Sequence, residues 1–537
     1  MIPGRHRAAC VGVVAGVAGL YAARYWVTWD RFIGAHRDET LWLPLAMRAN
    51  DGALFATDPL VPALGRFFPR AWVALSAAGL ELTADPATFT LLASTILLIV
   101  YATGVSVLSL AVSPHALVAA IVGVVSLRPN VDLSGIGWGI FVGNAEPRSF
   151  VYAASPWVLA AFLTFGRTPR VLAVLGIAVG ALGNLHPPSA LHLGALLAGA
   201  LVLAGPPAAR VGPAAALLGG VALGLAPYAT QWLRAFEPGQ IPMEIVAFRT
   251  GAEITPAWSD LAARVLGSFL VPCALAALAL WVASADPRRA ARRADLVRVA
   301  VAAVAGTLTA PLLPLLAPRL FALAPLRLSG YLFLVSLILA GELLRSMIDS
   351  HGGPAPGNPG RSSKNSGRLL AAAALAVGLV LTAGGGRVGD VRALFISERH
   401  AGAKLWTDAS STAGPLSRGD FLSLCGWARA HTEPSDLFLT PTGGWAPFRI
   451  YAARPLFVAY KDGSVVTYVV PQRAEAWYRR LLAVNALYAA FETDAVRRFA
   501  RAQGIRYVVQ ERTPPAVDLP IVYENASYRV YDACATC

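Results

Sequence analysis

Long apolar runs dominate residues 1–385 and constrain the fold more than any other feature of the chain. A helix rises about 1.5 Å per residue, so runs of roughly 17 to 25 residues can cross the hydrocarbon core of a bilayer. Lipid offers the backbone no hydrogen-bond partner, and such spans must be helical. With 56% hydrophobic and 14% charged residues, the chain is too apolar for an ordinary soluble protein. The sequence therefore predicts a polytopic α-helical membrane protein.

About eleven spans are expected. Basic residues precede the run from Ala8 to Trp29, which is long for a signal peptide and has no convincing cleavage site, so we interpret it as an uncleaved first span. The remaining spans are expected near residues 88–112, 115–127, 150–165, 171–184, 189–204, 213–233, 261–283, 297–317, 322–345 and 369–385. Residues 69–83 are also apolar but too short, and we place them within an outer loop at residues 30–87.

The net charge of +14 comes largely from arginines in short loops between spans, which favours a topology signal over nucleic-acid binding. The basic loops carry Arg167, Arg170, Arg210, Arg288 to Arg293 and Arg361 to Arg368. An amino terminus in the cytoplasm puts all of them on the cytoplasmic side. We therefore expect a multi-pass protein of the cytoplasmic (inner) membrane, whose carboxyl-terminal domain is extracytoplasmic.

The tail changes in character after residue 385. Residues 346–368, rich in Gly, Pro and Ser, predict a flexible cytoplasmic linker before the last span. Residues 386–537 alternate short β-branched or aromatic runs with helical runs, which indicates a small α/β domain. Its expected strands are Leu437 to Pro441, Pro455 to Tyr460, Ile505 to Gln510 and Ile521 to Tyr531, and its expected helices are Phe421 to His431 and Arg473 to Tyr488. The sequence allows two alternatives for Cys425, Cys534 and Cys537: one disulfide between two of them, or free thiols.

The outer loop at residues 30–87 carries the strongest chemical signal. Asp38 and Glu39 open it side by side, and an amphipathic run to Met47 predicts an interfacial helix. The segment from Gly52 to Pro59 reads Gly-Ala-Leu-Phe-Ala-Thr-Asp-Pro, and Phe68 to Trp72 return the chain to an apolar run.

This loop resembles the first extracytoplasmic loop of the GT-C superfamily of membrane glycosyltransferases, which use polyprenyl-phosphate sugars. The resemblance implies a GT-C fold and transfer of a sugar to a glycan, lipid or protein acceptor on the outer face. It also implies that Asp38 or Glu39 acts as general base or helps to hold a divalent cation, and it makes Asp58 a substrate-binding candidate. No cofactor is certain, with Mg²⁺ or Mn²⁺ as the open alternative and the metal ligands unknown.

The two adjacent carboxylates have a simpler interpretation as well. A carboxylate at membrane depth costs several kcal/mol unless water, a cation or a positive partner accompanies it. One reason to retain a carboxylate there despite this cost is that it acts as a general base and removes a proton from the acceptor hydroxyl. Asp38 and Glu39 could equally be an acidic pair favoured by the dipole at a helix amino terminus.

Further polar residues stand near the predicted outer ends of spans. The substrate-binding candidates there are Asn144, Glu146, Arg148 and His186. Glu146 and Arg148 could instead form an ion pair that braces their loop, and His186 could cap a helix. Polar, aromatic loops at Phe448 to Tyr451 and Tyr460 to Asp462 suit a carbohydrate or a headgroup.

Arg319 and Arg327 are the candidates for binding the donor phosphate, because guanidinium groups match phosphate oxygens in a bidentate manner. The alternative for both is interfacial snorkelling. No serine-hydrolase or zinc-protease motif occurs in the sequence. The leading prediction is an inverting membrane glycosyltransferase of the cell envelope, and the alternative is a non-catalytic or transport protein that retains the architecture.

Overall fold

The computed structural model describes residues 4–29, 31–34, 37–127, 130–131, 137–165, 167–204, 207–235, 242, 244–245, 248–249, 287–309, 325–351, 418–513 and 515–534. The chain divides into two units. Unit 1 comprises residues 1–29, 91–229 and 252–396, and unit 2 comprises residues 30–90, 230–251 and 397–537. The outer loop that the sequence assigned to the membrane domain thus belongs to the same unit as the carboxyl-terminal α/β domain.

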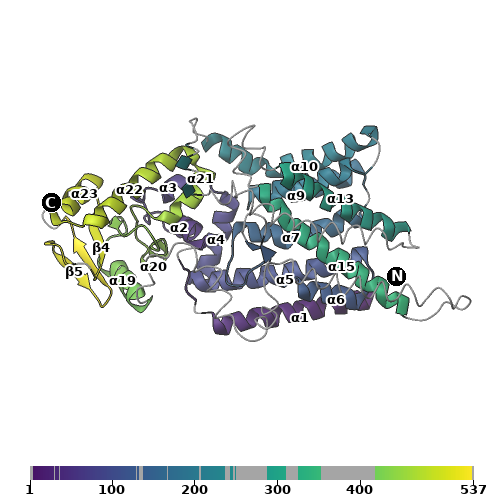
Figure 1. Ribbon diagram of the computed structural model, residues 1–537, viewed down its shortest axis with the longest axis horizontal. Helices are drawn as coiled ribbons and strands as arrows, with labels where there is room; N and C mark the ends of the chain where they lie inside the picture. The colour runs from purple at the N-terminus through teal and green to yellow at the C-terminus, as the bar shows by residue number, and fades with distance from the viewer. Residues whose placement is uncertain are drawn as a thin grey trace, which may run out of the picture. The chain divides into compact units, whose positions relative to one another are not determined.

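Unit 1 is a bundle of apolar helices around one hydrophobic core (Figure 1). Its elements are α1 (Gly4–Thr28), α5 (Pro86–Val112), α6 (Ala116–Val125), a short hairpin of β1 (Asn130–Val131) and β2 (Gly137–Trp138), α7 (Pro147–Thr164), α8 (Pro169–Leu182), α9 (Pro187–Val202), α10 (Pro207–Ala235), α13 (Pro287–Thr309), the 3-10 helix η3 (Pro325–Ser329) and α15 (Gly330–His351). Helix α1 packs on α6, and α9 packs on both α8 and α13.

Helices α8 and α10 approach each other closely through glycines. A Cβ atom added at Gly180 would lie 2.2 Å from the Val221 carbonyl oxygen, and one at Gly224 would lie 2.3 Å from the Ile177 carbonyl oxygen. Gly176 and Gly180 are spaced four residues apart on α8, as Gly220 and Gly224 are on α10. This spacing lets two backbones come into contact, which is the usual way in which helices associate within lipid.

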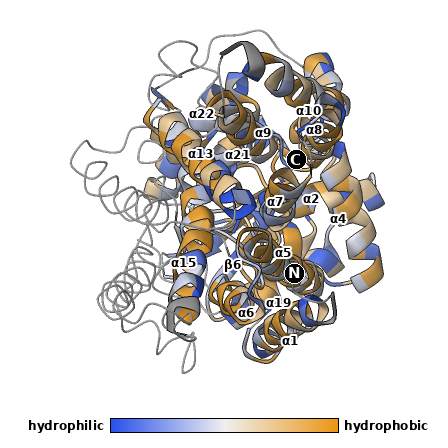
Figure 2. Ribbon diagram, turned by 90° about the vertical axis from the view of Figure 1, so that its right-hand side faces the viewer, coloured by the Kyte–Doolittle hydropathy of each residue, from blue (hydrophilic) through white to orange (hydrophobic). Residues whose placement is uncertain are grey.

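Four described helices are long and apolar enough to span a membrane: His6–Thr28, Pro86–Val112, Arg210–Ala235 and Leu326–Ser346. Hydrophobic residues predominate along them (Figure 2). Three further apolar helices, α6, α8 and α9, are shorter than 18 residues. The expected spans at residues 261–283 and 369–385 lie outside the described residues, and so does the linker from residue 352 onward. The class of protein predicted, an α-helical membrane protein, is confirmed, and the number of eleven crossings stays a prediction.

The amino-terminal part of unit 2 consists of α2 (Glu39–Asn50), α3 (Val61–Leu64) and α4 (Arg70–Thr83). Helix α2 begins where the sequence predicted the interfacial helix. It packs against α4 through an edge-to-face contact between Trp42 and Trp72, whose ring centroids lie 4.8 Å apart. With 14 residues, α4 reaches only about 21 Å at ~1.5 Å per residue, too short to cross the bilayer.

The carboxyl-terminal part of unit 2 is the predicted α/β domain. Its helices are α19 (Arg418–His431), α20 (Phe448–Ala452), η4 (Tyr460–Asp462), α21 (Gly463–Val469), η5 (Pro471–Arg473), α22 (Ala474–Ala490) and α23 (Thr493–Gln503). Its strands are β3 (Phe438–Leu439), β4 (Tyr507–Glu511), β5 (Ile521–Glu524) and β6 (Tyr528–Asp532), in the spatial order β3-β4-β6-β5. Strand β3 runs parallel to β4, and β6 is antiparallel to both of its neighbours.

Two expected strands differ from the observed ones. The run from Ile521 to Tyr531 is a hairpin because the Asn525 side chain accepts hydrogen bonds from the backbone N–H groups of Ser527 and Tyr528 and closes a turn. The run from Pro455 to Tyr460 forms only one isolated bridge, between Leu456 and Phe438. Helix α23, with its polar face, was not predicted.

Candidate functional site

The amino terminus of α2 brings Asp38 against the α/β domain. Asp38 occupies the N-cap position but makes no side-chain capping hydrogen bond. Its Oδ1 instead accepts from Nζ of Lys461 at 2.7 Å, and 38% of the Asp38 side chain stays exposed to solvent. Asp38 therefore combines an ionic partner with access for a second molecule, which a helix-capping role does not require.

Glu39, the neighbouring carboxylate, lies in a different environment. Its side chain is fully buried and accepts two hydrogen bonds from Arg37, at 2.7 Å from Nη2 and 3.3 Å from Nε. Successive residues on a helix point about 100° apart. The two acidic residues therefore do not share one site, and Glu39 braces the turn that precedes α2.

The segment that leads to Asp38 is anchored on α20. The backbone N–H of Ile33 donates to the Tyr451 hydroxyl at 2.7 Å, and the Phe32 ring stacks on Tyr451 with centroids 5.2 Å apart. Burial raises the pKa of Tyr451 to about 12, against the opposing effect of the Ile33 hydrogen bond. Tyr451 therefore stays protonated at neutral pH while it accepts this bond.

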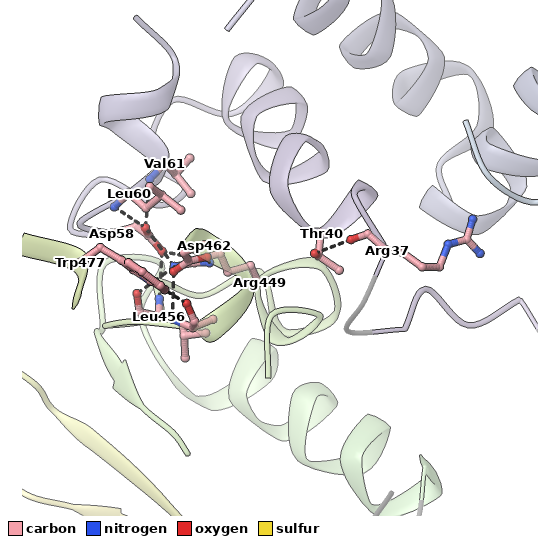
Figure 3. A network of polar contacts seen from close by, with 10 residues as sticks. Arg37, Thr40, Asp58, Leu60, Val61, Arg449, Leu456, Asp462 and Trp477 are labelled. Atoms are coloured by element: carbon pink, nitrogen blue, oxygen red, sulfur yellow. Dashed lines mark hydrogen bonds and ion pairs between the residues drawn. The ribbon is translucent and has the colours of Figure 1, made fainter. Parts of the chain in front are cut away.

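Asp58 lies at the centre of a buried ion-pair network (Figure 3). Its Oδ1 accepts from the backbone N–H groups of Leu60 and Val61, which closes the turn before α3. Its Oδ2 accepts from Nε of Arg449 at 2.7 Å and from the backbone N–H of Leu456 at 3.0 Å. The Asp58 side chain has no exposed surface, so the structure shows it joining the outer loop to the α/β domain.

Arg449 also binds a second carboxylate. Its Nη1 lies 2.6 Å from Oδ1 of Asp462, and Nη2 lies 3.1 Å from Oδ2. Burial by itself lowers the pKa of Arg449, but the carboxylates of Asp462 and Asp58 outweigh it and raise that pKa above the ordinary value. Burial raises the pKa of Asp462, and the Arg449 charge opposes this rise. One guanidinium thus serves two carboxylates in a region closed to water.

The polar loop before α7 is braced in unit 1. Glu146 forms an ion pair with Nε of Arg148 and accepts from Nδ2 of Asn144 at 2.8 Å. Oδ1 of Asn144 is buried and has no hydrogen-bond partner among the described residues. The bracing that the sequence analysis weighed against direct substrate contact is therefore present, and Asn144 keeps one acceptor atom for a donor from elsewhere.

His186 caps a helix, as the simpler interpretation held. It occupies the N-cap of α9, where its Nδ1 accepts from the backbone N–H of Ser189 and lies 2.8 Å from the Ser189 hydroxyl. The nearby Asn184 holds α10, because its Oδ1 accepts from the Tyr228 N–H and its Nδ2 donates to the Gly224 carbonyl.

Of the two candidates for binding the donor phosphate, Arg319 and Arg327, the structure describes only Arg327. Arg319 lies outside the described residues. Arg327 lies in η3, is half-buried, and its Nε is a buried donor without a hydrogen-bond partner among the described residues. A buried guanidinium nitrogen without an acceptor suits an anion that approaches from outside the protein.

The basic partners of Asp38 and Asp58 were missed by sequence reasoning. Lys461 and Arg449 lie 423 and 391 positions along the chain from Asp38 and Asp58, respectively. Their loops stood out as polar and aromatic, but no local pattern indicates which carboxylate each would meet. Two partners lie close enough in the sequence to be considered: Arg37, two residues from Glu39, and Arg148, two residues from Glu146.

A divalent cation does not fit the described carboxylates as they are arranged. No group of three or more His, Cys, Asp or Glu side chains gathers at a possible metal position within the described part of the chain. Asp38 and Glu39 each already contact a basic side chain, and those two positive charges would repel a bound cation.

The fold of this chain is similar to that of a solved glycosyltransferase. The structure is similar to that of the mycobacterial arabinofuranosyltransferase AftD, with a TM-score of 0.52 and 17% sequence identity over 97% of this chain and 40% of that chain. The chain thus spans less than half of AftD.

Other comparisons are weaker or shorter. The oligosaccharyltransferase of Archaeoglobus fulgidus, solved as a complex with Zn and sulfate, gives a TM-score of 0.45 and 13% identity over 93% of this chain and 68% of that chain. A family model described as a domain of unknown function (DUF6798) matches residues 419–484, from α19 into α22. No curated protein matches the sequence.

Proposed function

We propose that this protein is an inverting membrane glycosyltransferase that moves a sugar from a polyprenyl-phosphate donor to a hydroxyl-bearing acceptor on the outer face of the membrane. The observation that carries the proposal is the solvent-accessible carboxylate of Asp38, which lies at the start of α2 beside Lys461 in a GT-C fold. The acceptor is a glycan, a lipid or a protein of the cell envelope.

Asp38 is the proposed general base. The acceptor oxygen forms a bond to the anomeric carbon, the bond from that carbon to the donor phosphate breaks, and the phosphate leaves with the electron pair. The acceptor proton passes to the Asp38 carboxylate. A base must be unprotonated to act, and an ammonium group 2.7 Å away favours that form. Lys461 is a positioning residue in this scheme.

Glu39 supports the site without taking the proton. Its burial and its two hydrogen bonds from Arg37 leave it enclosed by protein. Arg37 in turn accepts a hydrogen bond at its carbonyl oxygen from the Thr40 hydroxyl, at 2.7 Å (Figure 3). This brace sets the direction in which the first turn of α2 presents Asp38.

Arg327 is the proposed contact for the donor phosphate, with Arg319 as the second cation. The support is the unpartnered Nε of Arg327 within the described residues. Asn144, whose Oδ1 has no hydrogen-bond partner among the described residues, is proposed to accept from a substrate hydroxyl. Glu146 and Arg148 brace its loop, His186 caps α9, and Asp58 joins the outer loop to the α/β domain.

Turnover by purified variants tests the proposal. General-base assistance is worth about 10² to 10⁴ in rate, so Asp38→Asn should lose nearly all transfer from a polyprenyl-phosphate sugar. Glu39→Gln should retain more activity and melt at a lower temperature. Asp51→Asn is the matched control, because Asp51 is an exposed carboxylate at the other end of α2. Near-normal turnover by both Asp38→Asn and Glu39→Gln would return the protein to the non-catalytic alternative.

A further inference from the structure

A cavity of about 230 Å³ lies within unit 2, between the outer-loop helix α3 and the helices α21 and α22 of the α/β domain. It is lined mainly by apolar side chains, among them Leu60, Phe457 and Trp477. Its charged lining residues are Arg473, Arg480 and Asp462, and the Asp462 carboxylate is already bound to Arg449. The ion pair between Asp38 and Lys461 does not line this cavity, which instead adjoins the buried network of Asp58, Arg449 and Asp462.

The two arginines give the cavity its positive charge. Burial lowers the pKa of Arg480, and the charge of Arg473 lowers it further. The carboxylates of Asp58 and Asp462 oppose this effect but are already bonded to Arg449.

Arg480 is held against an aromatic ring. Its guanidinium carbon lies 5.7 Å from the centroid of the Phe457 ring. Within the described residues, no ion pair links Arg480 to a carboxylate. A half-buried guanidinium whose face rests on an aromatic ring keeps its N–H groups directed outward for an anion.

The aromatic wall is fixed in position. Nε1 of Trp477 donates to the Ala459 carbonyl at 3.0 Å, and the six-membered ring packs so closely on Gly463 that a Cβ atom there would lie 2.4 Å from it. This wall therefore does not need to rearrange when a ligand enters. Apolar and aromatic surfaces beside a few charged groups are what binding sites for small polar ligands generally present.

We propose that this cavity binds an anionic saccharide, in which a carboxylate or a phosphate on the sugar meets Arg473 and Arg480 while the ring lies against Trp477 and Phe457. Guanidinium groups recognise both kinds of anion through paired N–H donors. The volume of about 230 Å³ is sufficient for one sugar residue, which suits the end of a longer glycan. The proposal does not depend on the transferase reaction, because binding alone defines it.

Ligand-observed NMR on the full-length protein in nanodiscs of zwitterionic lipid tests the proposal, because that method detects weak binding. The probes are glucuronate, glucose 6-phosphate, methyl glucoside and inorganic phosphate. We expect the two anionic sugars to bind at least about tenfold more tightly than the neutral sugar or the free ion, since hydrogen bonds to charged groups are worth ~1.5–3 kcal/mol. Their relative affinities identify the preferred anion.

The variants locate the binding. Arg480→Gln should weaken the anionic sugars about tenfold or more, and Arg480→Lys should restore part of the affinity. Arg479→Gln is the matched control, because Arg479 precedes Arg480 in α22, is 77% exposed and pairs with Glu475 on the surface. A melting curve for each variant checks folding. Equal affinity for neutral and anionic sugars would overturn the proposal, and so would an unchanged affinity in a folded Arg480→Gln protein. If inorganic phosphate binds as tightly as the anionic sugars, the cavity is a site for anions and the proposal of a saccharide ligand is wrong.

Discussion

Replacement of Arg449 by methionine should destabilise unit 2 severely. The Arg449 side chain is 1% exposed, and its partners Asp58 and Asp462 are 0% and 3% exposed. The substitution keeps most of the apolar volume but leaves two buried carboxylates without their cation. The loss of one partner from a buried ion pair costs about 3–5 kcal/mol, because the remaining charge has no compensation. That is a large part of the ~5–15 kcal/mol that stabilises a typical domain.

The measurement is thermal unfolding of the full-length protein in detergent. In units of about 150–250 residues, 1 kcal/mol shifts the midpoint by ~2–4 °C, so the transition of unit 2 should fall by about 6 to 20 °C. The rate of protease cleavage near α3 should rise as well, because the hydrogen bond from the Leu456 N–H to the Asp58 carboxylate would be disrupted. Arg479→Gln, which breaks an exposed pair with Glu475, should change the midpoint by little, because such pairs are worth ~0–1 kcal/mol.

A triple variant separates charge from packing. Arg449→Met together with Asp58→Asn and Asp462→Asn removes all three charges and should recover a substantial part of the loss, because uncharged amides are less costly to bury than carboxylates. If Arg449→Met melts like Arg479→Gln, the network does not hold the loop to the α/β domain and the reasoning fails.

Three further predictions concern the donor, a thiol and the topology. Charge-removing substitutions at both Arg319 and Arg327 should abolish binding of a polyprenyl-phosphate sugar in a folded protein; unchanged binding would leave them as interfacial anchors. Burial raises the pKa of the Cys425 thiol against the opposing charge of Arg429, so the thiol stays protonated between pH 7 and 9, and iodoacetamide should label it only after denaturation, as read by mass spectrometry. Rapid labelling of the native protein would contradict this. A periplasmic-type reporter fused after Val388 should be active and a cytoplasmic one inactive; the opposite pattern would refute the proposed orientation.

Local patterns in the sequence were enough to predict several elements. Residues that repeat with a helical period gave the correct type for α2, α19 and α22, since amphipathic spacing reflects local geometry. The apolar runs at residues 88–112 and 322–345 correspond to α5 and α15. The glycine spacing on α8 and α10 was equally visible in the sequence, but the contact between the two helices was not, because spacing on one helix does not say which partner it meets.

The sequence by itself determined the class of this protein and drew attention to Asp38, because the hydrophobicity of a span and the cost of a carboxylate beside it are properties of the local chain. Only the tertiary structure decided which of two adjacent carboxylates keeps contact with solvent. The pairing of Asp38 with Lys461 and of Asp58 with Arg449 joins segments about 400 residues apart, and no local rule selects among many possible partners over such a separation. The physical reason is that the burial and the pairing of these charges depend on how distant segments pack, so they contribute to the free energy only once the chain has folded.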